Sequence, residues 1–270
     1  MNSIHPTAVI EPGAEIGEDV SIGAYSVIGP KVKLGRSCQI ASHVVIAGHT
    51  SIGDETIVFQ FASVGAPPQD LKFKGEDSRL EIGARNIVRE YVTLQPGTLG
   101  GGMLTKIGDG NLFMACSHVG HDSILGNGNV VANSASIAGH VTIGDHVTIG
   151  GLVGIHQFVR VGNLALLGAG SMVAKDIPQF CLAQGDRAQL TGINVIGMER
   201  RGYAADVISR VRALYRTLFI APGLFKDKLG KVQGEFGQFD ECRSVIDFVK
   251  KSERGVAGAR AKKSAIDDQS

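Results

Sequence analysis

An aliphatic residue recurs at every sixth position through most of this 270-residue chain. The rhythm covers residues 4–64, resumes over 82–94, and runs again over 107–173, which makes 26 hexads. A small or β-branched residue, such as Ala8, stands two positions before each aliphatic one. Residues two apart face the same side of a strand, whereas a helix needs spacings of three and four. The repeat therefore predicts a parallel β-helix of short strands, with three hexads in each turn.

The composition fits such a coil. Glycine accounts for 37 residues, tryptophan is absent, and 43% of residues are hydrophobic, so we expect a thin aliphatic core. The glycines keep no three-residue period, which excludes collagen, and the aliphatic content excludes wholesale disorder. The four cysteines are scattered without a CxxC pair, which favours a reducing, cytoplasmic location. The sequence contains no signal-peptide pattern and no membrane-spanning run.

Two interruptions and one change of pattern suggest the domain organisation. Residues 65–81 and 95–106 leave the hexad rhythm, so we expect both to be loop insertions, where function often lies. The repeat ends near Gln184, and later apolar residues follow helical spacing. We therefore predict a β-helix over residues 1–190 and a helical C-terminal domain over 191–270 with a disordered tail. The helix-face residues are Val207, Val211, Leu214 and Leu218, followed by Val245, Ile246 and Val249.

The charge is divided unevenly between these parts. Residues 191–270 hold 15 Lys and Arg against 10 Asp and Glu, whereas the rest of the chain has an acidic excess. Two ordinary solvated surfaces would produce this balance. The alternative is a C-terminal part that meets an anion, such as a nucleotide phosphate or an acidic carrier protein.

The histidines give the strongest hint of chemistry. His121, in the segment His118–Asp122, falls at an outward corner of the coil by phase, and His140 follows Asp122 by three full hexads. Because three hexads make one turn, Asp122 and His140 should stack about 4.8 Å apart. His156 follows one approximate turn later. Histidine suits general-base work near neutral pH, and a carboxylate beside it would fix its tautomer.

Two other uses of these residues compete with a general base. Stacked histidines hold zinc in the γ-class carbonic anhydrases, but the H-x4-H spacing of that class is absent here. Cys116 lies two residues before His118 and is a conceivable nucleophile, although nothing in the sequence indicates a lowered thiol pKa. We therefore predict no metal.

The hexad pattern resembles the hexapeptide-repeat acyltransferases, whose coils are left-handed, and longer segments narrow the resemblance. The segments 111–122 (NLFMACSHVGHD), 69–72 (QDLK), 155–158 (IHQF) and 200–202 (RRG) are similar to the UDP-N-acetylglucosamine 3-O-acyltransferase family. The fold that this resemblance implies is mainly β, a left-handed parallel β-helix with a C-terminal α-helical cap. The activity it implies is transfer of a 3-hydroxyacyl chain from acyl carrier protein to the 3-position of UDP-N-acetylglucosamine, the first step of lipid A biosynthesis.

The same resemblance implies roles for individual residues. His121 matches the general base, Asp122 the residue that orients it, and the Gly139 N–H the donor to the oxyanion. The positions matching groups that hold the sugar, the nucleotide and its phosphates are Gln69, Asp70, Lys72, His118, His140, His156, Gln157, Asn194, Arg200 and Arg201. For the two arginines, the alternative is a solvated helix start. The family forms homotrimers with active sites between neighbouring coils. It needs no cofactor, because the phosphopantetheine belongs to the donor, and no nucleic acid is implied as a partner.

Three positions depart from the family pattern. Gln95-Pro96 replaces a His-Arg pair, Ile196 replaces an acidic residue near the nucleotide site, and Ala169 stands where a glycine leaves room for the end of a long acyl chain. Ala169 is therefore expected to influence acyl-chain length. The alternatives are a related sugar O- or N-acyltransferase, including one that uses a 3-amino UDP-sugar, and a scaffolding β-helix without activity. The N-acyltransferases of the pathway usually carry an extra N-terminal domain, whereas the hexads here begin at Ile4.

Overall fold

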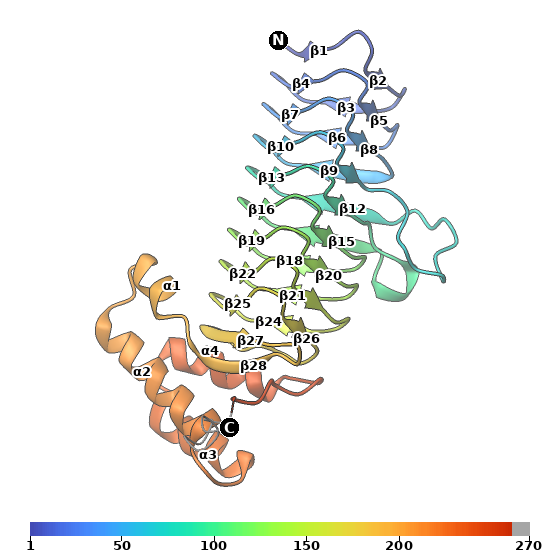
Figure 1. The fold of residues 1–270 in the computed structure, drawn as a ribbon. Helices are drawn as coiled ribbons and strands as arrows, with labels where there is room; N and C mark the ends of the chain where they lie inside the picture. The colour runs from blue at the N-terminus through green and yellow to red at the C-terminus, as the bar shows by residue number, and fades with distance from the viewer. Residues whose placement is uncertain (261–270) are drawn as a thin grey trace, which may run out of the picture.

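The computed structural model describes residues 1–260 as a long coil with helices at its C-terminal end (Figure 1). Each hexad forms one short strand, and each strand pairs in parallel with the third strand along the chain. The predicted left-handed parallel β-helix is thereby confirmed.

Three sheets form the faces of the coil, and all their strands pair in parallel except at the last pairing of the first sheet. The first contains β1 (Ser3–Ile4), β4 (Ser21–Ile22), β7 (Gln39–Ile40), β10 (Ile57–Val58), β13 (Ile87–Val88), β16 (Leu112–Phe113), β19 (Val130–Val131), β22 (Thr148–Ile149), β25 (Leu166–Leu167), β27 (Cys181–Gln184) and β28 (Gln189–Ile193). The second contains β2 (Val9–Ile10), β5 (Val27–Ile28), β8 (Val45–Ile46), β11 (Ser63–Val64), β14 (Thr93–Leu94), β17 (His118–Val119), β20 (Ser136–Ile137), β23 (Gly154–Ile155) and β26 (Met172–Val173). The third contains β3 (Glu15–Ile16), β6 (Lys33–Leu34), β9 (His49–Ile52), β12 (Arg79–Ile82), β15 (Leu104–Ile107), β18 (Ile124–Leu125), β21 (Thr142–Ile143) and β24 (Arg160–Val161).

The corners between the sheets repeat one backbone geometry. The second turn residue of most corners has a left-handed backbone, as at Asp122 with φ of 58° and His140 with φ of 60°. Such a conformation costs a non-glycine residue roughly 1–2 kcal/mol, and the hydrogen bonds of neighbouring turns hold it in place. His140 N–H, for example, donates to the His121 carbonyl at 2.9 Å. Residues one turn apart therefore stack in columns along each corner.

The core of the coil is narrow and aliphatic, as the composition predicts. The inward residues from Ile22 to Val173 are almost fully buried, and Phe113 supplies an aromatic side chain with no exposed surface. Asparagines occupy the small inward position in three successive turns. Asn111 Nδ2 donates to Asn86 Oδ1 at 3.0 Å, and Asn111 Oδ1 accepts the Asn129 N–H at 2.8 Å.

This buried ladder predicts a stability effect. Asn111→Ala leaves the Asn129 N–H without that acceptor, so the free energy of unfolding should fall by about 1–3 kcal/mol. Denaturant unfolding at one fixed protein concentration measures it. Val147→Ala, at another fully buried inward position, removes packing without stranding a polar group and serves as the comparison. A stability for Asn111→Ala equal to that of the unchanged chain would contradict the role of the ladder.

Two loops leave the coil beside β12 and β15 and project from the same side (Figure 1). The first loop comprises residues 65–78 and the second loop residues 95–103, which includes the 3₁₀ turn η1 (Leu99–Gly101). Residues 79–81 and 104–106, which we expected to belong to the insertions, instead extend the strands. They do so because β9, β12 and β15 are four-residue strands that pair along their whole length.

The C-terminal part begins with an antiparallel hairpin of β27 and β28, which the sequence analysis did not predict. The helices follow as α1 (Val195–Arg200), α2 (Ala205–Tyr215), the π-helical turn η2 (Arg216–Ile220), α3 (Phe225–Phe236) and α4 (Asp240–Lys250). Val211, Leu214 and Leu218 are buried, which confirms the predicted helix face. The predicted disordered tail lies mostly outside the described residues, although the Leu190 N–H donates to the Gly258 carbonyl at 2.9 Å.

Candidate active site

The candidate site lies on the corner where the chain turns from the second sheet to the third. We call the turns 120–122, 138–140 and 156–158 the site corner. Since each turn of the coil comprises three hexads, the first turn residues His121, Gly139 and Gln157 form one column. The second turn residues Asp122, His140 and Phe158 form the column beside it.

His121 and Asp122 form a hydrogen-bonded pair at this corner. His121 Nδ1 lies 2.8 Å from Asp122 Oδ2, and the Asp122 side chain has no exposed surface. A carboxylate only accepts hydrogen bonds, so Nδ1 carries a proton, and in the neutral imidazole Nε2 has the free lone pair. His121 lies at the outward corner that its phase predicts, and the residue is only 7% exposed there. The pair combines a nearly buried imidazole with a carboxylate that fixes its ring, an arrangement suited to a general base.

His140 stacks on this pair as the three-hexad period predicts. Its Nε2 lies 3.9 Å from Asp122 Oδ2. Its ring is edge-on to that of His121, with the two ring centroids 4.9 Å apart. The prediction that His156 stacks next is wrong, because His156 falls two positions short of a full turn after His140. Phe158 occupies that position, with its ring 4.5 Å from that of His140.

Gly139 brings a backbone donor to the base. Among residues 1–260, its N–H donates to no acceptor within hydrogen-bonding distance. A Cβ at this position would lie 2.6 Å from His121 Nε2, so only glycine lets the imidazole lie this close. The result is a lone pair and an unpaired N–H side by side, which suits a group that gains negative charge as it is attacked.

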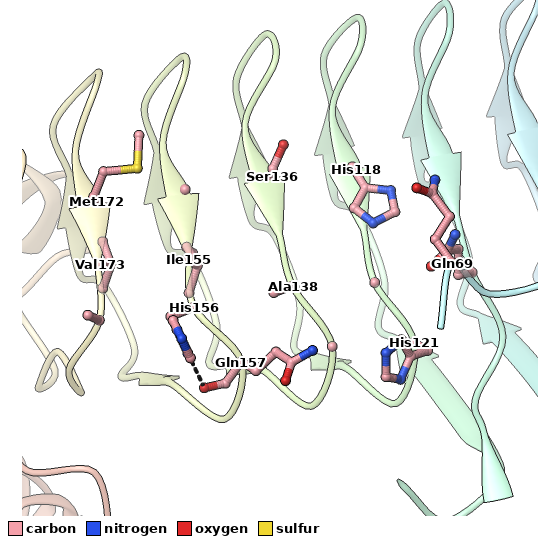
Figure 2. Close-up of a pocket in the computed structure, with 15 residues that line it drawn as sticks. Gln69, His118, His121, Ser136, Ala138, Ile155, His156, Gln157, Met172 and Val173 are labelled. Carbon is pink, nitrogen blue, oxygen red and sulfur yellow. Dashed lines mark hydrogen bonds between the residues drawn. The ribbon is translucent and has the colours of Figure 1, made fainter. Parts of the chain in front are cut away.

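A groove of about 520 Å³ runs from this pair across the second sheet (Figure 2). Its floor is the outward column His118, Ser136, Gly154 and Met172. Figure 2 shows His121 and Met172 toward opposite ends of this groove. The groove also contains His156, Gln157, Gln69 and Gln95. Of the predicted site residues, the structure therefore gathers His118, His121, Gly139, His156, Gln157 and Gln69 on one surface.

The pKa values of two further histidines near the groove are lowered, which favours their neutral forms. Burial lowers the pKa of His118, and the neighbouring His121 lowers it further. Burial also lowers the pKa of His140, although the Asp122 carboxylate opposes that shift. His118 Nδ1 lies 2.7 Å from Thr93 Oγ1, and His156 Nδ1 lies 3.1 Å from the Gln157 carbonyl, which accepts its proton. Neutral imidazoles offer directed hydrogen bonds to a polar substrate.

The first loop carries Asp70 and Lys72 toward the same corner. Asp70 Oδ1 accepts the Lys72 N–H at 3.0 Å, and the charges of both residues act on His140. The Lys72 side chain is exposed. The loop thus brings one acidic and one basic side chain close enough to His140 for their charges to act on it.

Comparison with known proteins decides the family. A model described as UDP N-acetylglucosamine O-acyltransferase, domain 2, matches residues 176–257, and one of bacterial transferase hexapeptide repeats matches residues 1–30. The acyl-[acyl-carrier-protein]–UDP-N-acetylglucosamine O-acyltransferase of Myxococcus xanthus is 49% identical over 256 residues, which are 95% of this chain and 99% of that protein. The chain belongs to this acyltransferase family.

Further members agree. The enzyme of the same name from Paracidovorax citrulli is 50% identical over 262 residues, covering 95% of this chain and all of that protein. The solved LpxA structure from Acinetobacter baumannii is 43% identical, with a TM-score of 0.91 and coverage of 94% and 99%. The UDP-N-acetylglucosamine acyltransferase structure from Campylobacter jejuni is 38% identical, with a TM-score of 0.90. The resemblance predicted from the motifs is confirmed over nearly the full length of the chain.

The predicted nucleotide contacts of this acyltransferase lie apart from the groove within one chain. Asn194 caps helix α1, since its Oδ1 accepts the Gly197 N–H at 3.0 Å while its Nδ2 donates to the Leu164 carbonyl at 2.9 Å. Arg200 and Arg201 are exposed. The alternative that they form a helix start is wrong, because they stand at the C-terminal end of α1. None of the three lines the groove.

Ala169 also lies away from the groove within one chain. It stands, exposed, on the corner between the first and second sheets, three residues before Met172. Met172 itself reaches into the groove, since a Cβ on Gly154 would lie 2.8 Å from its Sδ. The side chain that ends the groove in this chain is therefore Met172, which the sequence analysis did not single out.

The departures from the family pattern occupy different surroundings. Gln95 is only 4% exposed and lines the groove near His118, whereas Pro96 lines a separate hollow under the first loop. Ile196 is exposed on α1. The Gln95 carboxamide offers both a donor and an acceptor but no charge, so this edge of the groove presents hydrogen-bonding groups without a cation.

The two competing uses of the site are a metal centre and a Cys116 nucleophile. Ligand atoms of His121, Asp122 and His140 all lie within 4.8 Å of one another, as a metal site would need. The His121 Nδ1 proton and both Asp122 oxygens, however, already take part in hydrogen bonds. Cys116 is exposed on the corner between the first and second sheets and does not line the groove.

Within residues 1–260, no helix has the length and apolar character needed to cross a membrane.

Proposed function

We propose that this chain transfers a 3-hydroxyacyl group from acyl carrier protein to the 3-hydroxyl of UDP-N-acetylglucosamine, the first step of lipid A biosynthesis. The observation that carries the proposal is the His121–Asp122 pair beside the unpaired Gly139 N–H in a groove. The relatives named for this reaction cover almost the whole chain, which favours it over the N-acyltransferase and 3-amino-sugar alternatives.

The geometry suggests how the reaction proceeds. His121 Nε2 removes the proton from the sugar 3-hydroxyl as that oxygen attacks the thioester carbonyl. Asp122 accepts the Nδ1 proton in a hydrogen bond and so stabilises the imidazolium that forms. The Gly139 N–H donates to the oxyanion of the tetrahedral intermediate. When the carbon–sulfur bond breaks, the imidazolium returns the proton to the pantetheine thiolate.

The groove and the first loop would hold the acceptor. Donors and acceptors suited to sugar hydroxyls come from His118, His140, His156, Gln157 and Gln69. Asp70 and Lys72 stand where the sugar and its phosphates would enter. No cofactor or metal takes part in this scheme, because the phosphopantetheine arrives on the donor.

A homotrimer would complete the site. Asn194, Arg200 and Arg201 lie outside the groove of their own chain, so nucleotide contacts from them call for a second copy. An exposed ladder of stacked rings on the corner between the first and second sheets supports self-association, because exposed apolar surface of this kind marks interaction sites. Its members are Tyr25, His43, Phe61 and Tyr91, with neighbouring ring centroids 5.1–5.3 Å apart.

The basic balance of the C-terminal part supports an acidic carrier protein as donor. The scattered cysteines support a cytoplasmic location.

One assay tests the whole proposal. The purified chain is given a panel of 3-hydroxyacyl-carrier thioesters together with UDP-N-acetylglucosamine or its 3-amino analogue. We expect thiol release and ester formation with the 3-hydroxyl sugar. Amide formation on the amino sugar at a higher kcat/KM would contradict the assignment of a 3-hydroxyl acceptor. If no transfer occurs with either sugar, the chain is a scaffolding β-helix without activity.

The arginines at the end of α1 give a second test. Arg200→Ala and Arg201→Ala should raise KM for the UDP-sugar several-fold, because a charge-assisted hydrogen bond to phosphate is lost. The kcat at saturation should change less. Arg243→Ala, which removes an exposed arginine from α4, is the matched control. Unchanged KM values in both α1 variants would remove these arginines from the nucleotide site.

A further inference from the structure

The second loop lies directly on the carboxylate of Asp122. The Thr98 N–H donates to Asp122 Oδ1 at 2.9 Å, and Thr98 Oγ1 donates to Asp122 Oδ2 at 2.6 Å. His121 Nδ1 donates to the same Oδ2 at 2.8 Å. From the other side, the Asp122 N–H donates to Thr105 Oγ1 at 2.7 Å. Two threonines thus hold the carboxylate and its backbone from opposite directions.

Glycines let the second loop approach this closely. A Cβ on Gly101 would overlap the Asp122 carboxylate, and one on Gly97 would lie 2.8 Å from Asp122 Oδ1. The loop backbone at Gly97 and Gly101 therefore lies against the carboxylate. Thr98, which contacts the carboxylate through both its N–H and its hydroxyl, is itself only 4% exposed. The burial of Asp122 follows from this contact, since the coil at this corner would otherwise leave the side chain open to water.

The loop is also closed on itself around Thr98. The N–H groups of Gly101 and Met103 both donate to the Thr98 carbonyl, at 3.1 and 3.0 Å. The Gly97 N–H donates to the Arg79 carbonyl at 3.1 Å, which ties the loop to β12. Hydrogen bonds within the loop and to β12 therefore hold the Thr98 backbone in place independently of the contact between its side chain and Asp122.

We infer that Thr98 is a positioning residue for the acyl transfer, acting through Asp122 on His121. The inference rests on the proposed function, in which His121 is the base. Both donors of Thr98 fix the plane of the carboxylate, and that plane sets the direction of the His121 Nδ1–H bond. The direction in turn aims Nε2 along the face of Gly139, where the sugar hydroxyl must stand. A reacting group is sensitive to misplacement of this kind.

The test is a pair of substitutions at one position. Thr98→Val keeps the shape of the side chain but removes the hydroxyl, and Thr98→Ser restores it. We expect Thr98→Val to lower kcat roughly 10–100-fold, by analogy with the loss seen when the hydrogen-bond partners of metal-bound histidines are removed. KM for both substrates should stay within about twofold, because Thr98 does not line the groove. Thr98→Ser should recover most of kcat.

Thr56→Val is the matched structural control. Thr56 is fully buried, and its hydroxyl donates to the Gly83 carbonyl at 3.2 Å, far from the groove in the coil. It should lose stability comparably but keep its kcat. If Thr98→Val does not fold, Gly101→Ala provides a second route, since its methyl group pushes the loop off the carboxylate and should lower kcat in the same way.

The outcomes separate this inference from the proposed function. If His121→Ala is inactive while Thr98→Val and Gly101→Ala both keep the kcat of the unchanged enzyme, the positioning role is wrong and the base assignment stands. If His121→Ala remains active, the proposed function fails whatever Thr98 does. A loss of kcat in Thr98→Val that serine does not rescue also overturns the role of the hydroxyl.

Discussion

His121→Gln should lower kcat for acyl transfer roughly 10²–10⁴-fold, the usual contribution of a general base. Glutamine is close to histidine in length, and its side-chain amide still donates to Asp122. It cannot take a proton from the sugar hydroxyl. His121→Ala should show the same loss. Steady-state transfer with a 3-hydroxyacyl-carrier thioester and UDP-N-acetylglucosamine is the measurement, and KM for either substrate should change far less than kcat.

Two controls accompany this substitution. His146→Ala alters a corner histidine with the same left-handed backbone as the stacked corner residues, on a different edge of the coil. It should leave transfer unchanged. Thermal unfolding of His121→Ala should show a lowered midpoint, since a nearly buried ring is removed from above Asp122. Activity of His121→Gln within a few-fold of the unchanged enzyme would contradict a base at this position.

The coil could be predicted from the sequence because its geometry is local and periodic. Side chains alternate along each short strand and the chain turns once in every hexad. One aliphatic residue of each hexad therefore points into the core, as Ile22 and Ile28 do. The register follows too, because every turn without an insertion has the same length. That is why the stacking of Asp122 and His140 could be predicted from the sequence. The spacing from His140 to His156 is two residues short of three hexads, which is why the predicted position of His156 was wrong.

The contacts of the loops could not be predicted in this way. Thr98 lies 24 residues before Asp122 and Thr105 lies 17 residues before it. Neither spacing is a multiple of a turn, because Thr98 lies within the second loop and Thr105 stands one position out of register with Asp122. The only sequence signal was the loop itself, with four glycines among residues 97–102. Glycines in such a run indicate a close backbone approach, but they do not name what is approached.

The C-terminal part shows a second limit. Helix α2 and helix α4 were visible because each has several residues on a buried stripe, such as Val211 and Val245. Helix α3 buries little beyond Val232, so its apolar pattern is too thin to read. In the proposed trimer, Arg200 would reach the groove of a second copy of the chain, and no periodicity within one sequence encodes such a contact.

Acyl-chain length should respond strongly to Met172. The groove floor is small at Ser136 and Gly154 and then meets the thioether of Met172, which reaches back over Gly154. One methylene in an apolar pocket is worth about 1–3 kcal/mol, or roughly 10–200-fold in discrimination. Met172→Gly removes the obstruction, so the preferred 3-hydroxyacyl chain should lengthen by two or more carbons, with kcat/KM for the longer thioesters rising in that range.

Ala169 provides the comparison that locates the limit. Its exposed methyl group faces away from the groove of its own chain, so it can limit the acyl chain only where a neighbouring copy brings that corner to the groove. In a trimer, Ala169→Gly should lengthen the preferred chain slightly and Ala169→Met should shorten it. The measurement is kcat/KM across an even-numbered 3-hydroxyacyl series for the unchanged enzyme and the three variants. A profile that moves with Met172 alone places the limit within one chain, because the floor of the groove is then its end. A profile that moves with Ala169 alone contradicts the role of Met172 and assigns the limit to the contact between copies.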